Sequence, residues 1–146
     1  MKRYSLADYR VSIDSNDPTI KSMFGTISIG GEGSYLGSIG VSQNSNLWNT
    51  KGFATGAWAH DKNLDRTGKC QIQLHQLSND VVKLIRLFNV FYSGNYGSST
   101  IVVSDNLGNK IASCTDCFIE KASDQNFSES SENQTWTFTC GKVVFG

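Results

Sequence analysis

Four cysteines and two histidines are the residues of this sequence best suited to metal or redox chemistry. Cys114 and Cys117 form a C-x-x-C pair, which serves as a zinc half-site or a redox pair when it lies on a knuckle or a helix N-terminus. Here the pair falls in a predicted strand, where residues three apart point to opposite faces unless a bulge intervenes. The sequence holds no second C-x-x-C to complete a tetrahedron. Structural thiols are therefore the favoured interpretation.

The other two cysteines, Cys70 and Cys140, occupy apolar positions of two predicted strands, where a thiol behaves as a small buried hydrophobic group. A disulfide between them is geometrically possible if the two strands are neighbours. The N-terminus carries no apolar segment typical of a signal peptide. We therefore expect synthesis in a reducing cytosol, where disulfides seldom persist and free thiols are the default.

Residues for acid–base or nucleophilic catalysis are present but not arranged for it. His60 falls in an irregular region and His75 on the polar side of a strand, with no nucleophile motif such as G-x-S-x-G to support either. Asp14 and Asp17 lie in a polar turn, where solvation keeps carboxylates ionised. The glycines of residues 31–37 precede a strand, although a nucleotide loop requires a helix. We expect no catalytic residue, no cofactor and no metal ligand, and hence no enzyme.

Trp48 and Trp58 are large aromatic residues in a stretch otherwise rich in Asn, Ser and Gly. Such residues are common in glycan-binding sites and in protein interfaces, because one ring supplies much contact area. A role in the hydrophobic core for one or both is the plain alternative.

Composition indicates a folded chain with an ordinary core. The 146 residues are 38% hydrophobic, a size and composition sufficient for one domain. Thirteen basic residues balance thirteen acidic ones without blocks of like charge, which disfavours binding to nucleic acid by phosphate neutralisation. No apolar run reaches the roughly 18 residues that a membrane-spanning helix needs.

The elements that must position these residues are mainly strands. Alternating apolar and polar residues predict strands at 8–13, 24–29, 35–43, 69–77, 100–104, 110–121 and 135–140. We interpret residues 24–43 as a hairpin, residues 14–18 as a turn, and residues 44–63 as a long loop with at most a short strand. One helix is predicted at about residues 79–92, because Ser78 offers an N-cap and apolar residues follow at helical spacing.

Several short motifs, each different, follow one another along the chain. They are Tyr4–Asp8, Gly30–Gly33, Asp65–Gly68, Ser78–Asn79, Ile101–Ser104 with Asp105 and Gly108, Cys117–Lys121, Trp136–Phe138, and Gly141–Lys142. Their order and spacing resemble the tail tube proteins of contractile-tailed bacteriophages and of related phage-tail-like bacteriocins. The likeness covers almost the whole chain and departs from the family pattern between Asn44 and Asn63.

This resemblance implies a β-sandwich or barrel tail-tube fold with one flanking α-helix, and a single tail tube domain over residues 1–146. It implies hexameric rings of identical copies stacked into the inner tube of a virion tail, a conduit for DNA ejection assembled in the host cytoplasm. Implied partners are further copies of the chain, the tail sheath protein, the tape measure protein and DNA in the lumen, and baseplate and tail terminator proteins. No membrane partner is implied.

A channel through which DNA slides should not present cations to phosphate, because each contact adds salt-dependent affinity. Strands with a second exposed face carry uncharged polar residues, so the bore-lining candidates are Thr26, Ser28, Gln71, Gln73, Thr135, Thr137 and Thr139. Lys69 is an exception. The inter-subunit candidates, from segments 1–7 and 44–63, are Tyr4, Leu6, Leu47, Trp48, Phe53 and Trp58. The 24–43 hairpin is expected to help line the bore.

Three alternatives to a phage tail tube stay open at this point. A bacteriocin tube would share the fold but conduct ions in place of DNA. A carbohydrate-binding or receptor-binding β-sandwich module would use Trp48 and Trp58 and would be a monomer. A small cytosolic enzyme would need polar residues converging in a cleft, for which the sequence offers none.

Overall fold

The computed structural model describes residues 3–30, 35–94 and 97–146. Its elements in chain order are η1 (Leu6–Asp8), β1 (Tyr9–Ser15), α1 (Pro18–Phe24), β2 (Ile27–Gly30), β3 (Leu36–Gln43), β4 (Trp48–Gly52), β5 (Trp58–Lys62), β6 (Gly68–His75), α2 (Asn79–Ser93), β7 (Ser99–Asp105), β8 (Lys110–Lys121) and β9 (Asn133–Phe145). The mainly β fold with a central helix, predicted from the sequence, is confirmed.

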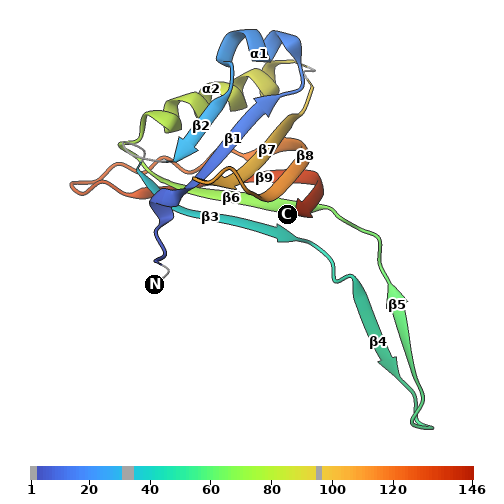
Figure 1. Cartoon of the computed structure of the whole chain (residues 1–146). Coiled ribbons are helices and arrows are strands. Elements are labelled where there is room, and N and C mark those ends of the chain that lie inside the picture. The colour runs from blue at the N-terminus through green and yellow to red at the C-terminus, as the bar shows by residue number, and fades with distance from the viewer. Residues whose placement is uncertain (1–2, 31–34, 95–96) are drawn as a thin grey trace.

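Seven strands form one antiparallel sheet in the order β2-β1-β7-β8-β9-β6-β3. The sheet curls, and α2 lies across its inner face (Figure 1). We call this sheet with α1 and α2 the body. The second sheet consists of β4 and β5 alone, and it projects away from the body.

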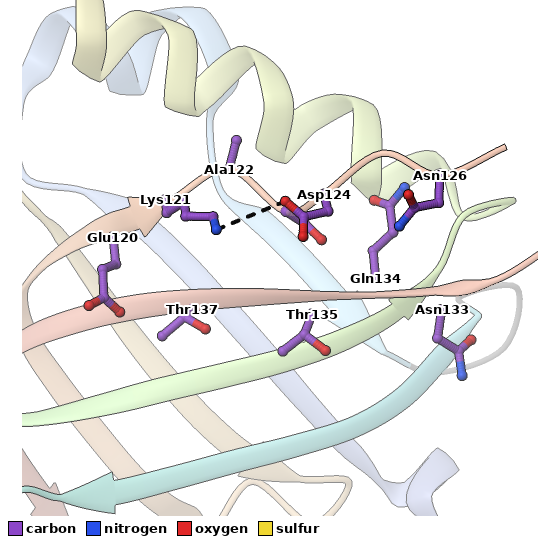
Figure 2. Close-up of a pocket in the computed structure, with 10 residues that line it drawn as sticks. Glu120, Lys121, Ala122, Asp124, Asn126, Asn133, Gln134, Thr135 and Thr137 are labelled. Atoms are coloured by element: carbon purple, nitrogen blue, oxygen red, sulfur yellow. Dashed lines mark ion pairs between the residues drawn. The ribbon is translucent and has the colours of Figure 1, made fainter.

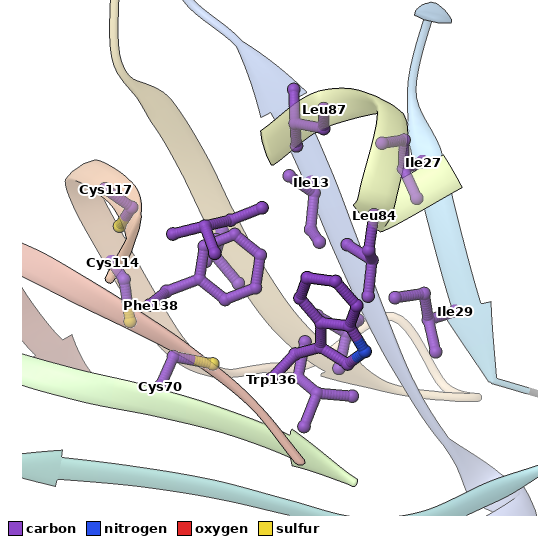
Figure 3. Packing of buried hydrophobic residues seen from close by; sticks show 14 of the residues in the cluster. Ile13, Ile27, Ile29, Cys70, Leu84, Leu87, Cys114, Cys117, Trp136 and Phe138 are labelled. Atoms are coloured by element: carbon purple, nitrogen blue, oxygen red, sulfur yellow. The ribbon is translucent and has the colours of Figure 1, made fainter. Parts of the chain in front are cut away.

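The core of the body fills the space between the curled sheet and α2. Trp136 and Phe138 of β9 are fully buried there, and Leu84 of α2 packs against them with isoleucines of β1 and β2 (Figure 3). The helix begins where it was predicted to begin, because the Ser78 side chain accepts a hydrogen bond from the Asp80 N–H at 3.3 Å. The apolar residues that alternate along the strands and those at helical spacing in α2 therefore pack into one buried cluster. None of the described helices is long and apolar enough to cross a membrane.

The expectation of one helix was wrong, because α1 follows β1 where only a turn was predicted. Asp17 caps this short helix by accepting a hydrogen bond from the Thr19 N–H at 2.9 Å, and Pro18 occupies its first turn. Gly25 ends it with a left-handed φ of 62°. Seven residues with a single buried side chain, Ile20, are too few to show a helical period.

The predicted hairpin at residues 24–43 was also wrong. β2 pairs with β1, whereas β3 pairs with β6, so the two strands lie at opposite edges of the sheet. Both strands alternate as expected, but alternation does not reveal which strand is the partner. The glycine-rich residues 31–34 lie outside the described residues.

Residues 44–63 are not a long loop. β4 and β5 form a hairpin in which Trp48 lies opposite Lys62 and Gly52 lies opposite Trp58. The Phe53 N–H donates to the Ala57 carbonyl at 2.9 Å, which closes the turn. We call residues 48–62 the arm. Every residue of β4 is exposed, so the arm has no buried face and no alternating pattern from which strands could be predicted.

The C-x-x-C pair lies at a bulge in β8. Asp116 has a left-handed φ of 57°, and the register between β7 and β8 shifts between the pairs Ile101–Cys114 and Ser99–Cys117. The extra residue turns Cys117 to the same buried face as Cys114. From the sequence, the side chains of Cys114 and Cys117 were expected to share one face only if a bulge lay between them, and the structure has that bulge.

Candidate functional site: a polar face and an apolar arm

The outer side of β3, β6 and β9 forms a continuous surface of uncharged polar side chains. The register sets Gln71 opposite Thr137 and Gln73 opposite Thr135, and it sets Ser38 of β3 opposite Gln73. Residues directly opposite each other in a sheet share one face. The structure therefore brings five of the predicted bore-lining residues together. We call this surface the polar face; it consists of Ser38, Ser42, Gln71, Gln73, Thr135, Thr137 and Thr139.

The remaining two predicted bore-lining residues do not belong to the polar face. Ser28 lies opposite Ser12 of β1, at the far edge of the sheet, and Thr26 precedes β2 and donates a hydrogen bond to Asp14. In the sheet order, β1, β7, β8 and β9 separate β2 from β6. Within one copy of the chain, Thr26 and Ser28 form a separate polar patch.

Lys69, the predicted exception, lies on the same side of β6 as the polar face, between Ser42 of β3 and Thr139 of β9. Its ammonium group lies 3.4 Å from a carboxylate oxygen of Glu120 on β8, and both side chains are partly exposed. The ion pair balances the lysine charge locally, although an exposed pair of this kind contributes little stability. The polar face thus presents a neutralised lysine, and Glu120 is a residue that sequence reasoning missed.

Beside Thr135 and Thr137 the surface is hollowed, with a volume of about 710 Å³ (Figure 2). The segment that follows β8 forms its rim, where Lys121 pairs with Asp124 at 3.9 Å. The Gln134 amide donates to Gln125 at 2.8 Å and holds this segment against β9. Hydroxyl and amide side chains make up most of the lining, and Glu120, Lys121 and Asp124 add charged groups on the β8 side.

The arm carries large apolar side chains that the body does not cover. Trp58 is 71% exposed, Trp48 54% and Phe53 50%, and Leu47 at its base is also exposed. Lys62 lies over the Trp48 ring and Lys51 over the Phe53 ring, each 5.6 Å from the ring centroid. Four predicted inter-subunit residues therefore lie on one projecting element.

A network around Asp65 fixes the base of the arm. Its carboxylate accepts hydrogen bonds from the Thr67 N–H at 2.9 Å, the Thr67 hydroxyl at 2.7 Å and the Ser45 hydroxyl at 2.8 Å. These hydrogen bonds, led by that of the Thr67 backbone, lower the pKa of Asp65 below its ordinary value of 3.8. Asn44 donates to the Thr67 carbonyl at 2.9 Å across the same base. Both chains entering the arm are thus held together.

Tyr4 and Leu6, the other two predicted inter-subunit residues, line an apolar recess in the body of about 300 Å³. Ile39 and Val41 of β3 form one wall, and Phe145 at the end of β9 forms part of the rim. Phe145 and Ile111 are exposed apolar residues of this recess that sequence reasoning missed. Ile111 falls in a predicted strand, whereas β9 extends to Phe145 beyond the strand predicted at 135–140, and only the curl of the sheet brings both residues beside the N-terminal segment.

Both histidines make local hydrogen bonds to neighbouring residues. The His60 ring hydrogen bonds to the Thr50 hydroxyl at 2.8 Å across the arm, and the His75 ring accepts from the Leu77 N–H at 3.3 Å. In the part of the chain that the structure describes, no three His, Cys, Asp or Glu side chains are placed to hold one metal ion. The four cysteines are buried free thiols.

Comparison with protein families matches residues 1–145 to the model of the bacteriophage PhiTE tail tube protein. The chain belongs to this phage tail tube family. It is thus a structural component of a tail-like particle, and the family resemblance inferred from the sequence is confirmed. Comparison with curated protein sequences gives no match.

Solved structures show the same fold as this tail tube protein. The chain is similar to a component of the PVC sheath–tube complex of an extracellular contractile injection system in its extended state, with 12% identity and a TM-score of 0.60; 99% of this chain and 92% of that one are covered. The sheath/tube terminator of that system matches with 10% identity and a TM-score of 0.56, covering 100% and 98%. The tube-terminating cap of the anti-feeding prophage matches with 14% identity and 0.52, covering 100% and 93%.

Proposed function

We propose that this tail tube protein forms hexameric rings that stack into the inner tube of a contractile phage tail and conduct DNA during ejection. The observation that carries this proposal is the arm. A two-stranded hairpin is at best marginally stable in water by itself, and this one exposes two tryptophans and a phenylalanine. Packing on another molecule would bury these side chains and stabilise the hairpin.

The two ends of the body's sheet support assembly within a ring. In the described part of the chain, β2 and β3 are the terminal strands, and no strand lies beyond either of them. An open edge is a template for pairing with another chain, and closure of several sheets into one barrel removes it. If copies stood side by side in a ring, β2 of one copy could pair with β3 of the next, so that neither edge would be left open.

The polar face is the surface we assign to the bore. Its hydroxyl and amide side chains are uncharged, and Lys69, which lies among them, is paired with Glu120, so the pair adds no net charge. DNA would find few cations to bind there and would slide with little retention. In this arrangement Thr26 and Ser28, at the other edge of the sheet, line the bore only beside a neighbouring copy.

The apolar recess is the surface we assign to the arm of a second copy. It lies on the body, whereas the arm of the same chain projects away from the body (Figure 1). Tyr4, Ile111 and Phe145 are exposed around it, so an aromatic side chain of the arm would bury apolar surface on both sides. This assignment uses both sets of predicted inter-subunit residues in one contact.

The expected partners are the tail sheath outside the tube, the tape measure protein and DNA inside it, and baseplate and terminator proteins at its ends. The similarity to chains of a sheath–tube complex and of terminators supports the sheath and terminator partners. The family of a phage tail tube protein supports a virion tail rather than a bacteriocin. Assembly would take place in the host cytoplasm.

Electron microscopy with sedimentation velocity tests the proposal on the full-length chain. We expect ring stacks or tubes of uniform bore in equilibrium with a small amount of free subunit. Dispersed monomers at all concentrations would contradict it. If those monomers also bound a sugar, and did so through Trp48 and Trp58, the carbohydrate-binding alternative would replace it.

A further inference from the structure

Cys117 and Cys140 form a closely opposed pair of thiols in the core of the body. They lie directly opposite each other on the neighbouring antiparallel strands β8 and β9, and their sulfur atoms are 3.1 Å apart. Cys117 is fully buried and Cys140 is 3% exposed.

The backbone at Asp116 determines the face on which this pair lies. Relative to β7, the extra residue at Asp116 places Cys117 on the buried face. Relative to β9 the register is unbroken here, with Thr115 opposite Lys142 and Cys117 opposite Cys140. Gly141 permits the bulge, because a Cβ on it would approach the Cβ of Asp116 to 3.2 Å. The local backbone is therefore arranged around the cysteine pair.

The other two cysteines lie close by but are placed differently (Figure 3). Cys114 is opposite Val143 and Cys70 is opposite Phe138, so neither faces a cysteine directly across a strand. The Cys70–Cys140 pairing considered from the sequence joins neighbouring strands, but Cys140 lies opposite Gly68 in that ladder. Cys117 is the thiol that faces Cys140.

We propose that Cys117 and Cys140 are a redox site that forms a cross-strand disulfide when the protein leaves a reducing environment. Directly opposed cysteines on adjacent strands satisfy the Cα separation of about 4.4–6.8 Å that a disulfide needs. The sulfurs need to approach by only about 1 Å to reach the bond length of roughly 2.05 Å. The inference goes beyond tube assembly and does not depend on it.

The oxidant belongs to the class of small-molecule disulfides, such as oxidised glutathione. The thiolate of one cysteine attacks a sulfur of the oxidant, which gives a mixed disulfide and releases one reduced thiol. The second cysteine then loses its proton and attacks the mixed disulfide, which forms the Cys117–Cys140 bond and releases the second thiol. The protein loses two hydrogens, and the oxidant is reduced to two thiols.

Before the protein leaves the reducing environment, burial and the neighbouring thiols keep Cys117 and Cys140 protonated and therefore reduced. Hydrogen bonding with Cys114 raises the pKa of Cys140 to about 12, and hydrogen bonding with Cys114 and Cys140, together with burial, raises the pKa of Cys117. The attacking thiolate is therefore scarce near neutral pH. A chain made in a reducing cytosol would remain a dithiol there, and exchange would become irreversible in practice only outside the cell.

The bond would join two strands on either side of the 123–132 segment, which otherwise depends on amide contacts such as Gln125–Gln134. Closing this loop restricts the unfolded chain, so the oxidised body should resist heat better than the reduced one. We expect the midpoint of thermal unfolding to rise by roughly 5–15 °C on oxidation. Dithiothreitol should reverse the rise.

The test is incubation of the full-length protein with oxidised glutathione at mildly alkaline pH, followed by alkylation in denaturant and peptide mapping. We expect two of the four thiols to disappear and the peptides of Cys117 and Cys140 to be joined. Cys114→Ser and Cys70→Ser are matched controls that should keep the bond. Cys117→Ser, or Cys117→Ala if the serine variant does not fold, should keep its remaining thiols reduced and lose the thermal shift.

The proposal is overturned if all four thiols persist after prolonged incubation just below the unfolding temperature. It is also overturned if the wild-type bond joins Cys114 or Cys70. Electron microscopy of the same samples reports assembly separately, so a protein that forms tubes without the bond, or the bond without tubes, distinguishes failure of this inference from failure of the proposed function.

Discussion

The body and the arm are both antiparallel β structure, yet they are stabilised in different ways. In the body, Trp136, Phe138 and Leu84 are fully buried between the sheet and α2, and burial of this kind supplies most of the free energy of folding. In the arm, β4 pairs with β5 through backbone hydrogen bonds, and both tryptophans remain exposed. The arm exposes large aromatic side chains and has no core of its own.

This difference separates the residues that make the fold from those that make the assembly. Side chains of the body's core should affect the stability of one copy, whereas side chains of the arm should affect contact between copies. The polar face is a third case, since its side chains are neither buried nor apolar. On the proposed function, the polar face lines the bore and lets DNA pass because it binds DNA only weakly.

The largest effect on folding is expected from the body's core. Trp136→Ala should lower the free energy of unfolding by about 3–5 kcal/mol, because it leaves a cavity between β9 and α2. Urea denaturation followed by circular dichroism measures the change. Leu107→Ala, at an exposed position in the β7–β8 turn, is the control that should change stability by less than about 0.5 kcal/mol. Equal effects from the two substitutions would mean that the core is not where the structure places it.

Substitutions in the arm are expected to weaken assembly and to leave the stability of one copy nearly unchanged. Trp48→Ala combined with Trp58→Ala should raise the protein concentration needed for assembly by roughly tenfold or more, because aromatic residues dominate interface energies. The free energy of unfolding of the monomer should change by less than about 0.5 kcal/mol. Sedimentation velocity and denaturation measure the two quantities.

Phe127→Ala is the matched control for the arm, because it removes an aromatic ring that is also exposed but lies in the loop before β9. Assembly should be unchanged in this variant. If the arm variant assembled like the wild type, the division of labour between body and arm would be incorrect.

Added charge on the polar face should have a smaller effect. Gln71→Lys with Thr137→Lys places two cations opposite each other on β6 and β9 and should give the protein affinity for duplex DNA. The logarithm of the binding constant should fall with the logarithm of salt concentration with a slope of about 0.9 per phosphate contacted. Fluorescence anisotropy measures the slope.

The control for this charge series is Ser128→Lys with Ser130→Lys, in the loop between β8 and β9. In assembled tubes these lysines should not add to DNA retention. Equal retention by both variants would show that DNA does not contact the polar face in preference to the rest of the surface.

The smallest effect is expected at the base of the arm. The pKa of Asp65 is lowered by hydrogen bonds, so its contribution to local stability is present above pH 3.8 and is lost as the pH falls through the lower folded-state pKa. Amide hydrogen exchange of Thr67 should quicken over that acidic range. In Asp65→Asn the exchange should already be faster at neutral pH and should lose this pH dependence; an unchanged profile would contradict the role of the carboxylate.

The periodicity of apolar residues predicted those strands and helices that have one buried side and one exposed side. β6 and β9 alternate because one side is buried against α2 and the other is the polar face, and α2 shows its period because Val81, Leu84 and Leu87 share one buried side. The turn chemistry of residues 105–109 located the β7–β8 hairpin correctly. Where burial is one-sided, sequence alone is informative.

The arm, α1 and the strand partners could not be predicted in this way. β4 and β5 are exposed on both sides, and α1 buries only Ile20, so neither produces a period. The pairing of β3 with β6 is a long-range choice that a local pattern does not contain. The apolar recess joins residues from both ends of the chain, which is why Ile111 and Phe145 were missed while Tyr4 and Leu6 were selected.

The most direct test of the central claim is a cryo-electron microscopy reconstruction of tubes grown from the full-length chain. The account predicts hexameric rings in which Gln71 and Thr137 face the bore and Trp48 and Trp58 of each arm contact another copy. A reconstruction in which the polar face lies on the outside of the tube, or in which the arms extend into solvent without touching a neighbour, would contradict it.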